Sequence, residues 1–310
     1  MNKFITILIT AATTILSQSS CSMPTEPAPT ATPTPTITSA PTATPEPTVA
    51  VPEIAPENQT DLLVHFIDVG QADSILVQND GENMLIDGGN VADSSLIVSY
   101  LRDYNVKTLD YLVCTHAHED HGGGLNAAVR NFEVETVFAP KTGSDAKFYE
   151  KLLDGIYAKG LEITTPEAGY SFTLGDASVQ VLGPVSESSD DKNNTSIVLK
   201  LVDGENSFLF TGDAEREEEQ DIINAGYDLS ADVLKVGHHG SNSSTTYPFL
   251  REVMPSYAVI CVGKDNSYSH PTEEVLSRLR DADADVYRTD LHGHIVAKSD
   301  KQNITFTHKK

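Results

Sequence analysis

The pattern of hydrophobic and polar residues predicts three short strands near the start of the apolar part of the chain. Apolar runs occupy residues 62–69, 74–78 and 84–87, and polar or glycine-containing segments separate them. The connections at 70–73 and 79–82 are short, and the second contains the Asp-Gly pair typical of tight turns. Short connections join antiparallel neighbours, so we expect these strands to form an antiparallel meander.

Helical and strand-like patterns alternate through the rest of the chain. A helix is predicted over 94–104 and a strand over 110–114. Further strands are predicted near 134–138, 177–182, 196–202, 206–211, 231–236, 257–262, 285–289 and 302–307, and further helices near 145–158, 214–225, 246–253 and 272–280. The order gives two roughly similar halves. We therefore predict an α+β fold in which two sheets pack face to face with helices outside.

The first 21 residues have the layout of a bacterial export signal. Lys3 precedes an apolar run over 4–16, and small residues then lead to Cys21. The run is too short for a comfortable membrane span. Cys21 resembles a lipoprotein cleavage site, although Gln18 stands where that pattern has Leu or a similar residue. We expect an extracellular protein anchored to the outer face of the cell membrane through a lipid on Cys21, with plain secretion as the alternative.

Residues 22–60 are rich in Pro, Thr, Ala and Glu, with repeated Pro-Thr units. Such a composition cannot bury apolar surface, so the segment is predicted to be a disordered, extended linker. At about 3.1 Å per residue it would span on the order of 100 Å. The remaining residues, 61–310, are enough for one large α/β domain or two small ones, and nothing in them requires a split.

The chain is strongly acidic and contains few cysteines. Its formal charge is −24 with a pI near 4.6, so its surface as a whole repels polyanions. This argues against tight, processive binding of nucleic acid, but not against phosphodiester hydrolysis, because bound divalent cations invert the local electrostatics. Of the three cysteines, Cys114 and Cys261 lie in apolar runs. They are predicted to be small core residues, and no disulfide framework is expected.

One loop carries the densest group of potential metal ligands. Residues 115–121 read Thr-His-Ala-His-Glu-Asp-His and follow an apolar strand. His116 and His118 are two residues apart, so both rings can point the same way in an extended or tightly turned loop. Asp120 and His121 can then face a second ion beside the first. The spacing therefore predicts a site for one or two metal ions.

Two further features of this loop bear on that prediction. The glycine run at 122–124 is expected to supply backbone freedom where the loop bends into the next helix. The alternative interpretation is a polar surface loop that happens to be rich in histidine. The apolar run at 111–114 argues against a surface loop, because this run is predicted to be a buried strand and the histidine loop follows it directly.

Other aspartate and histidine residues that could bind metal also follow predicted strands. The packed strands can direct their side chains at a common point. These residues are Asp87, Asp213, His238, His239 and His270. Each has a simpler interpretation when taken alone: Asp213 as a helix N-cap, and His270 as a surface histidine before a proline. Together with the histidine loop they predict a single active site.

With these residues the chain resembles the metallo-β-lactamase fold superfamily. More narrowly it is similar to the hydrolase domain of the ComEC competence proteins and to free-standing exported relatives of that domain. The resemblance rests on the motifs around Asp87, His116 and Asp213 and on segments 66–74, 193–196, 235–241, 269–271 and 288–290. These motifs and segments are spread over nearly all of 62–310. Ala72 departs from the glycine usual in that branch.

The resemblance implies a four-layer αββα sandwich with a one- or two-metal site at one edge. It implies that His116 and His118 bind the first metal, Asp120 and His121 bind the second, and Asp213 bridges them. The metal would be one or two divalent ions, zinc or manganese. No histidine occurs between residues 122 and 237, where the superfamily has a third ligand of the first site.

The resemblance implies that Asn194 takes that third position, as is typical of the ComEC branch. An amide oxygen is a harder ligand than imidazole, so the first site would select Mn²⁺ or Mg²⁺ more readily than a three-histidine zinc site does. Among the later histidines we favour His238 as a ligand, with His239 and His270 placed to bind the substrate or protonate its leaving group. Asp120 could orient the attacking water as well as bind metal.

The resemblance implies an exported hydrolase that uses a metal-activated water. A phosphodiester suits a two-cation clamp best, so a nuclease-like phosphodiesterase is the first choice, acting on a small-molecule or nucleic-acid substrate. Hydrolysis of an amide, ester or lactone is the alternative reaction. A surface-tethered binding module on a hydrolase fold is the alternative of a different class. No protein partner is inferred.

Overall fold

The computed structural model describes residues 61–186, 189 and 191–309. The predicted export signal at 1–21 and linker at 22–60 lie outside the described residues. Within the described ranges, no helix is long and apolar enough to cross a membrane. The described residues belong to a compact unit that spans Ile54–Lys310.

The three leading strands form the predicted antiparallel meander and sit in an eight-stranded sheet. Phe66 pairs with Ile75, and Ile75 pairs with Ile86. The strand order is β15-β14-β1-β2-β3-β4-β5-β6. Its strands are β1 (Leu62–Phe66), β2 (Ile75–Asn79), β3 (Glu82–Ile86), β4 (Thr108–Val113), β5 (Glu133–Phe138), β6 (Ile163–Thr164), β14 (His294–Ser299) and β15 (Ile304–Lys309). β3 to β6 are parallel, so their carboxyl ends share one edge.

A second, seven-stranded sheet repeats this arrangement. Its order is β13-β12-β11-β10-β9-β8-β7, and β10 to β13 are parallel. The strands are β7 (Ser171–Leu174), β8 (Ala177–Gly183), β9 (Val198–Asp203), β10 (Asn206–Phe210), β11 (Val233–Lys235), β12 (Tyr257–Ile260) and β13 (Asp285–Arg288). In each sheet an antiparallel meander therefore leads into parallel strands, which confirms the two similar halves expected from the sequence.

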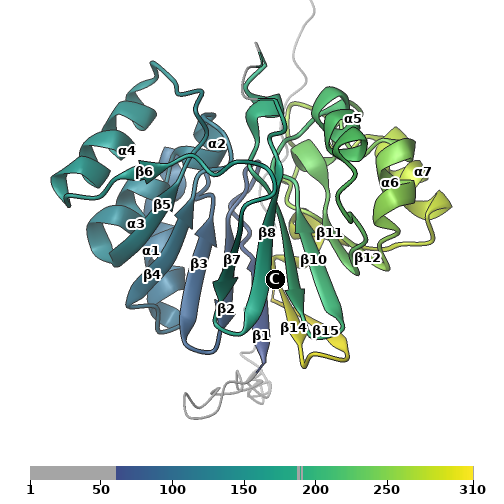
Figure 1. Cartoon of the computed structure of the whole chain (residues 1–310), viewed down its shortest axis with the longest axis horizontal. Coiled ribbons are helices and arrows are strands. Elements are labelled where there is room, and N and C mark those ends of the chain that lie inside the picture. Colours follow the sequence, from purple (N-terminus) through teal and green to yellow (C-terminus); the bar gives the residue numbers. More distant parts are fainter. Residues whose placement is uncertain (1–60, 187–188, 190, 310) are drawn as a thin grey trace, which may run out of the picture. The chain divides into compact units, whose positions relative to one another are not determined.

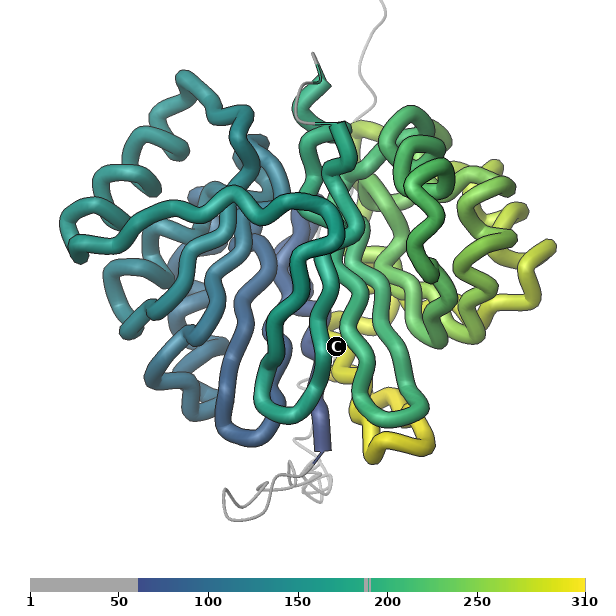
Figure 2. The backbone as a smooth tube through the Cα atoms, in the orientation of Figure 1, coloured from purple at the N-terminus to yellow at the C-terminus, as the bar shows by residue number. Residues whose placement is uncertain are grey.

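Helices cover the outer face of each sheet. α1 (Ser94–Asp103), α3 (Leu125–Asn131) and α4 (Lys147–Ala158) pack on the first sheet. α5 (Arg216–Ala225), α6 (Tyr247–Val253) and α7 (Glu273–Asp281) pack on the second. Figures 1 and 2 show the two helical groups on opposite sides of the paired sheets. Shorter helices are η1 (Val91–Asp93), α2 (Glu119–Gly122), η2 (Asn193–Thr195), η3 (Gly237–Gly240) and α8 (Thr289–His292).

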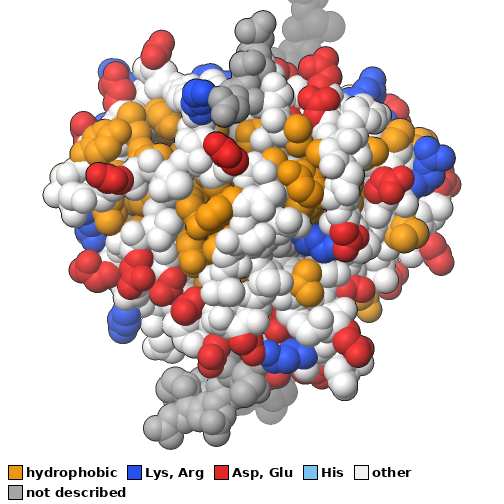
Figure 3. Space-filling view, in the orientation of Figure 1, with side chains coloured by type: hydrophobic (Ala, Val, Ile, Leu, Met, Phe, Trp, Pro, Cys, Tyr) orange, Lys and Arg blue, Asp and Glu red, His pale blue; other side chains and the backbone are white. Residues whose placement is uncertain are grey.

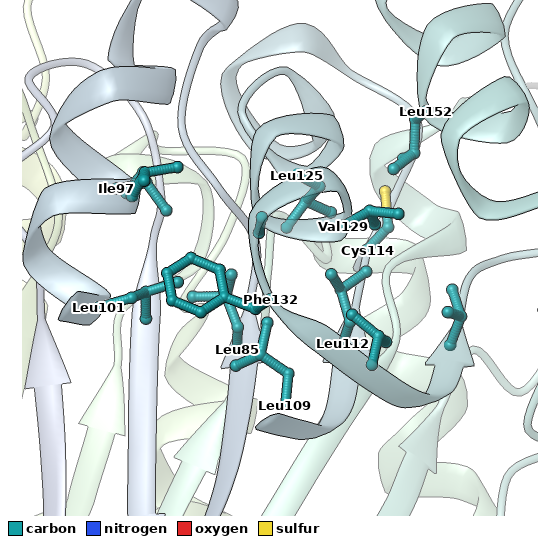
Figure 4. Packing of buried hydrophobic residues seen from close by; sticks show 14 of the residues in the cluster. Leu85, Ile97, Leu101, Leu109, Leu112, Cys114, Leu125, Val129, Phe132 and Leu152 are labelled. Atoms are coloured by element: carbon teal, nitrogen blue, oxygen red, sulfur yellow. The ribbon is translucent and has the colours of Figure 1, made fainter. Parts of the chain in front are cut away.

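Three apolar clusters hold these four layers together. Leu101 of α1 and Val129 of α3 pack with Leu112 of β4 under the first helical layer (Figure 4). Between the sheets, Phe66 and Phe210 lie with ring centroids 6.5 Å apart. A third cluster lies beneath α5, α6 and α7. The layers confirm the predicted αββα sandwich.

Both cysteines in the described part of the chain are core residues. Cys114 and Cys261 are fully buried and free. Burial raises the pKa of each thiol well above its usual range. They therefore behave as small apolar side chains, as the sequence predicts.

Several peripheral elements of the fold were not predicted from the sequence. β6 has two residues, and β7 has four of which only Leu174 is buried. β14 alternates buried and partly exposed positions and contains His294 and Lys298, so its apolar signal is weak. The short helix α8 was also not predicted. These elements are recognised by their pairing and packing with other segments rather than by their own pattern.

The glycine run after the histidine loop has a different role from the one predicted. Gly123 has a φ of −59° and Gly124 a φ of −85°, which are ordinary values for any residue. A Cβ on Gly123 would lie 2.5 Å from the Val91 nitrogen, and one on Gly124 would lie 2.0 Å from the Gly88 oxygen. The prediction of backbone freedom is therefore wrong. These glycines let the histidine loop and the loop after β3 approach backbone to backbone.

Glu218 in α5 predicts a pH dependence of stability that is separate from the histidine cluster. Its side chain is buried and accepts a hydrogen bond from the Val185 nitrogen at 2.8 Å. Burial raises the pKa of Glu218 to about 7. The folded state therefore holds this proton more tightly than the unfolded state does, so its stabilising contribution is full below about pH 4.5 and is lost as the pH rises towards 7.

Replacing Glu218 with Gln should flatten that dependence. We expect Glu218→Gln to be more stable than the parent at pH 8 by roughly 1–3 kcal/mol and no more stable at pH 4.5. Urea unfolding at the two pH values measures this difference. Equal stability of the two proteins at pH 8 would show that the Glu218 carboxylate is not penalised by burial.

Candidate metal centre

Loops from both sheets meet at the carboxyl ends of their parallel strands. The loop after β3 carries Asp87, that after β4 carries 115–121, that after β10 carries Asp213, that after β11 carries His238 and His239, and that after β12 carries His270. α2 and α5 begin at this edge, the upper edge in Figure 1. Parallel strands place the loops that follow them at one edge, which is where α/β proteins build their sites.

A first group of potential ligand atoms surrounds Nε2 of His116, contributed by His118 and Asp213. Nε2 of His116 lies 3.0 Å from Nδ1 of His118 and 3.9 Å from Oδ2 of Asp213. Nδ1 of His116 lies near the Thr115 and Ser196 hydroxyls, at 3.2 and 3.4 Å, which leaves Nε2 facing the group. Ligands about 2.0–2.1 Å from a tetrahedral ion are about 3.4 Å apart. Both distances from Nε2 of His116 are compatible with a cation shared at this atom.

Asp120, His121, Asp213 and His239 form a second group beside the first. Nε2 of His121 is 3.2 Å from Oδ2 of Asp213. Nε2 of His239 is 3.3 Å from Oδ2 of Asp120 and 3.6 Å from Oδ2 of Asp213. Asp213 lies in both groups, so its carboxylate is placed to bridge two ions.

Three buried atoms of these groups lack a hydrogen-bond partner among the described residues. They are Nε2 of His121, Nε2 of His239 and Oδ1 of Asp213. A buried polar atom left unpaired costs roughly 1–3 kcal/mol. A divalent cation would satisfy all three, and imidazole with carboxylate is a donor set that zinc and manganese accept. The residues therefore fit the metal that the resemblance implies.

The structure places His239, rather than His238, inside the second group. His239 is buried, whereas about a quarter of the His238 side chain is exposed. Nε2 of His238 is 3.7 Å from Oδ2 of Asp213, and its Nδ1 is held by Oε1 of Glu215 at 2.9 Å. The His270 ring lies 5.7 Å from the His238 ring. His238 and His270 therefore line the rim, which differs from the sequence-based choice of His238 as the ligand.

Asn194 also differs from its expected role. Its Oδ1 accepts a hydrogen bond from the Glu215 nitrogen at 3.0 Å. Because a backbone N–H can only donate, this bond fixes the amide with its oxygen on Glu215. Asn194 therefore positions the start of α5 in this structure, and its role as a ligand of the first site stays a prediction. Asp213, predicted as a possible N-cap, is not the cap of α5, which is Glu215.

Asp87 orients the His121 ring by contacting its Nδ1 atom, on the side of the ring away from Asp213. Oδ2 of Asp87 lies 2.8 Å from Nδ1 of His121 and accepts a hydrogen bond from the Thr115 hydroxyl at 2.7 Å. Oδ1 of Asp87 accepts a bond from the Thr115 nitrogen at 2.8 Å. With Nδ1 facing the carboxylate, Nε2 of His121 is free to bind a cation. Asp87 thus supports a ligand instead of binding metal itself.

A buried ion pair between Lys235 and Asp73 orients the His239 ring, as Asp87 orients that of His121. Nζ of Lys235 is 2.7 Å from Oδ2 of Asp73, and both side chains are fully or almost fully buried. Nδ1 of His239 lies 3.0 Å from the Cys261 oxygen and 3.2 Å from Oδ1 of Asp73. These contacts direct Nε2 of His239 towards Asp120. Asp73 and Lys235 lie in motifs that the sequence singled out, but neither was assigned a role there.

In the second group, the carboxylates and the imidazoles each stabilise the charged form of the other. Burial alone would raise the pKa of Asp213, but the neighbouring His121 and His239 hold it well below its usual range. Burial opposes protonation of His239, yet the carboxylates of Asp213 and Asp73 raise its pKa to about 10. Without a cation the carboxylates thus retain protons on the imidazoles. Metal binding must displace those protons, so metal affinity falls at low pH.

Backbone strain is concentrated at the same loops. Asp87, His238 and His239 are non-glycine residues with φ values of 59°, 48° and 52°. Such left-handed conformations are sparsely populated for these residue types and persist only when the surroundings enforce them. Two consecutive left-handed residues turn His239 inwards and His238 outwards, which a periodic pattern in the sequence does not reveal.

The different positions of His238 and His239 lead to a direct prediction. His239→Gln should lower the bound metal by about one ion per chain and the affinity for that ion by 10–100-fold or more, because it removes a ligand. His238→Gln should retain metal binding and alter only substrate turnover. Metal analysis after dialysis distinguishes the two. Loss of metal in His238→Gln with retention in His239→Gln would reverse the assignment.

Comparisons with known proteins agree with this architecture. A sequence model of the Metallo-beta-lactamase superfamily matches residues 67–264. ComE operon protein 3 of Bacillus subtilis is 33% identical over 262 residues, covering 79% of this chain and 33% of that protein. Competence protein ComA of Neisseria gonorrhoeae is 34% identical over 244 residues, covering 78% and 33%. The chain thus spans about a third of the length of these relatives.

Solved structures share the fold at low sequence identity. The metallo-β-lactamase fold protein YhfI from Bacillus subtilis aligns with a TM-score of 0.51 and 15% identity, over 77% of this chain and all of that one. CmlA from Streptomyces venezuelae, a diiron β-hydroxylase, aligns with a TM-score of 0.51 and 14% identity, over 82% and 55%. These likenesses concern the fold alone. The family match, the αββα layers and the histidine–aspartate centre together show that the chain belongs to the metallo-β-lactamase superfamily.

Proposed function

We propose that the protein is a metal-dependent hydrolase of phosphodiesters. The observation that carries this proposal is the position of Asp213. Its Oδ2 lies 3.9 Å from Nε2 of His116 in the first ligand group and 3.2 Å from Nε2 of His121 in the second. A carboxylate shared by two adjacent cation sites is the arrangement that clamps the attacking and leaving oxygens of a phosphoryl centre. The name of one relative, Competence protein ComA, refers to competence and supports the same choice.

The ligand groups assign a role to each residue around Asp213. In this proposal His116, His118 and Asp213 would hold one zinc or manganese ion, and Asp120, His121 and His239 would hold a second together with Asp213. Bound ions of this kind lower the pKa of a water and stabilise negative charge on oxygen. The first group has no third imidazole, so it should be the weaker of the two sites.

The residues at the rim would hold the substrate. About a third of the Asp120 side chain is exposed, so its carboxylate can also orient a water molecule next to the second group. His238 and His270 present their rings at the mouth of the site. Burial lowers the pKa of His118, and the nearby charge of Lys192 adds to this effect. In this proposal Lys192, whose Nζ donates to the Ser144 hydroxyl at 3.1 Å, would provide a cation for a phosphate oxygen.

The surroundings of the site favour a small or flexible substrate. A cavity of about 420 Å³ lies beside His238, and its lining includes Asp191, Glu215, Glu217 and Glu274 against one cation, Arg216. Acidic side chains are also spread over the face shown in Figure 3. A long duplex would carry many phosphates across this negative surface without compensation. A substrate with one or a few phosphodiesters avoids most of that repulsion.

A panel of activated substrates tests the proposed reaction. The full chain loaded with Mn²⁺ or Zn²⁺ should hydrolyse bis-p-nitrophenyl phosphate faster than p-nitrophenyl acetate or a chromogenic β-lactam, relative to the same metal in buffer. Preference for the carboxylic substrates would favour amide or ester hydrolysis. Stoichiometric metal with no turnover on any of them, together with retained binding of a partner, would favour the binding module.

We also propose that the protein is exported and held at the outer face of the cell membrane by a lipid on Cys21. The layout of residues 1–21 supports this, and Cys21 is the only cysteine of the chain outside the described core. Cys21→Ser should move the protein from the membrane fraction to the medium, as judged by detergent partitioning of cell fractions. Equal partitioning of the two proteins would support plain secretion.

A further inference from the structure

An exposed aromatic side chain stands at the mouth of the metal centre. Tyr268 is 67% exposed, and its ring stacks on that of His270 with centroids 5.7 Å apart and planes 29° apart. His270 in turn lies 5.7 Å from His238, whose Nε2 is 3.7 Å from Oδ2 of Asp213. Tyr268 is therefore two ring contacts away from the bridging carboxylate.

The loop that presents Tyr268 is braced by one side chain. Oδ1 of Asn266 accepts hydrogen bonds from the nitrogens of Tyr268 and His270, at 3.1 and 3.0 Å. Nδ2 of Asn266 donates to the oxygens of Gly263 and His270, at 2.9 and 2.6 Å. The Gly263 nitrogen also donates to Oε1 of Gln71, at 3.1 Å. The tyrosine is thus fixed at its backbone by a network that reaches the neighbouring loop.

Nothing in the packing explains why a tyrosine should be held there. None of the hydrogen bonds among the described residues uses its hydroxyl, and His270 is its one ring partner among them. A large apolar surface that is both exposed and rigid loses little conformational entropy when a ligand covers it. Such a side chain is suited to binding.

We propose that Tyr268, stacked on His270, forms a platform for an unpaired nucleobase attached to the phosphodiester at the metal centre. The proposal rests on the function proposed above and specifies the substrate class. Every base has a flat π-face, and stacking on an aromatic ring contributes about 1–3 kcal/mol for each base. Stacking is also insensitive to the acidic surface, whereas additional phosphate contacts along a longer strand would be weakened by it. Bases within a duplex are already stacked, so the platform selects single-stranded or mononucleotide substrates.

Two substrates that differ only in the base test this proposal. They are thymidine 5′-p-nitrophenyl phosphate and its abasic counterpart, in which hydrogen replaces thymine. With the full metal-loaded chain, Tyr268→Ala should lower kcat/KM about tenfold for the thymidine ester, the factor that about 1.4 kcal/mol represents, mainly through a higher KM. It should leave the abasic ester unchanged. Tyr268→Phe should retain the preference, and Tyr157→Ala, which alters another exposed tyrosine on α4, should be neutral.

Equilibrium binding separates this proposal from the proposed reaction. Calorimetry with thymidine 5′-monophosphate and with abasic deoxyribose 5-phosphate requires no turnover, and Tyr268→Ala should weaken binding of the first alone, about tenfold. Base-dependent binding without hydrolysis would contradict the phosphodiesterase and leave the platform standing. Hydrolysis with no base preference, or an equal loss on both esters in Tyr268→Ala, would overturn the platform and leave the phosphodiesterase standing.

Discussion

Asp213→Asn is expected to reduce hydrolysis by at least about 10²–10³-fold and to leave less than one tightly bound metal ion per chain. The substitution keeps the size of the side chain but removes the charge shared by the two ligand groups. His121 and His239 each lie within 3.6 Å of Oδ2 of Asp213, so both lose their anionic neighbour. Metal analysis after dialysis, together with turnover of bis-p-nitrophenyl phosphate, measures the two effects.

Asp154→Asn on α4 is the matched control, because Asp154 is exposed and lies in a different layer. It should retain both the metal and the activity. If Asp213→Asn kept the full metal content and more than about a tenth of the turnover, the bridging role of Asp213 would be wrong, since loss of such a ligand costs far more than tenfold.

Lys235→Met should destabilise the protein by about 3–5 kcal/mol. Lys235 and Asp73 are buried together with Nζ 2.7 Å from Oδ2, so removal of the lysine leaves a carboxylate uncompensated in the interior. That carboxylate would also stand near Asp213 and Asp120, around His239. Urea unfolding at neutral pH measures the loss. The same variant should bind its second metal less tightly, because His239 loses its fixed partner.

The double variant Lys235→Met, Asp73→Asn provides the internal test. Removing both charges should recover most of the lost stability, because it abolishes the unpaired charge. Lys200→Met is a matched control: Lys200 pairs with Asp228, which is 75% exposed, so that loss should be within about 1 kcal/mol. A Lys235→Met protein as stable as the parent would show that the Lys235–Asp73 pair has no energetic importance.

The sequence predicted the fold well because its elements are strongly patterned. The short connections between β1, β2 and β3 leave few alternatives to an antiparallel meander, and the amphipathic helices mark the outer layers. The peripheral elements β6, β7, β14 and α8 were not predicted because they are stabilised by pairing and packing with other segments and have no strong hydrophobic pattern of their own. β14, for example, is defined by pairing with β1, more than 200 residues earlier in the chain.

The residues of the metal centre were predictable in kind but not in orientation. His116, His118 and His121 lie in one loop, so their convergence follows from local spacing. The choice between His238 and His239 depends on two consecutive left-handed residues, which local preference disfavours and only the packed surroundings enforce.

The supporting contacts depend on long-range geometry. Asp73 follows β1 in the first sheet and Lys235 ends β11 in the second, so their pairing exists only after the sheets have packed. Asn194 matches the position of a missing ligand in the sequence, yet its oxygen bonds to the Glu215 nitrogen. Asp73, Lys235 and Asn194 are polar residues whose partners are distant in the sequence or belong to the backbone. No pattern within one segment identifies such a partner.

The proposed hydrolysis of a phosphodiester depends on two cations held around Asp213. Its most direct test is to strip the full chain with a chelator, titrate it with Mn²⁺ or Zn²⁺, and follow bound metal and bis-p-nitrophenyl phosphate hydrolysis together. On this proposal there is no activity without metal, and the rate rises with occupancy until two ions are bound per chain, one for each ligand group. Hydrolysis that survives complete removal of metal, or two bound ions with no phosphodiester hydrolysis, would contradict it.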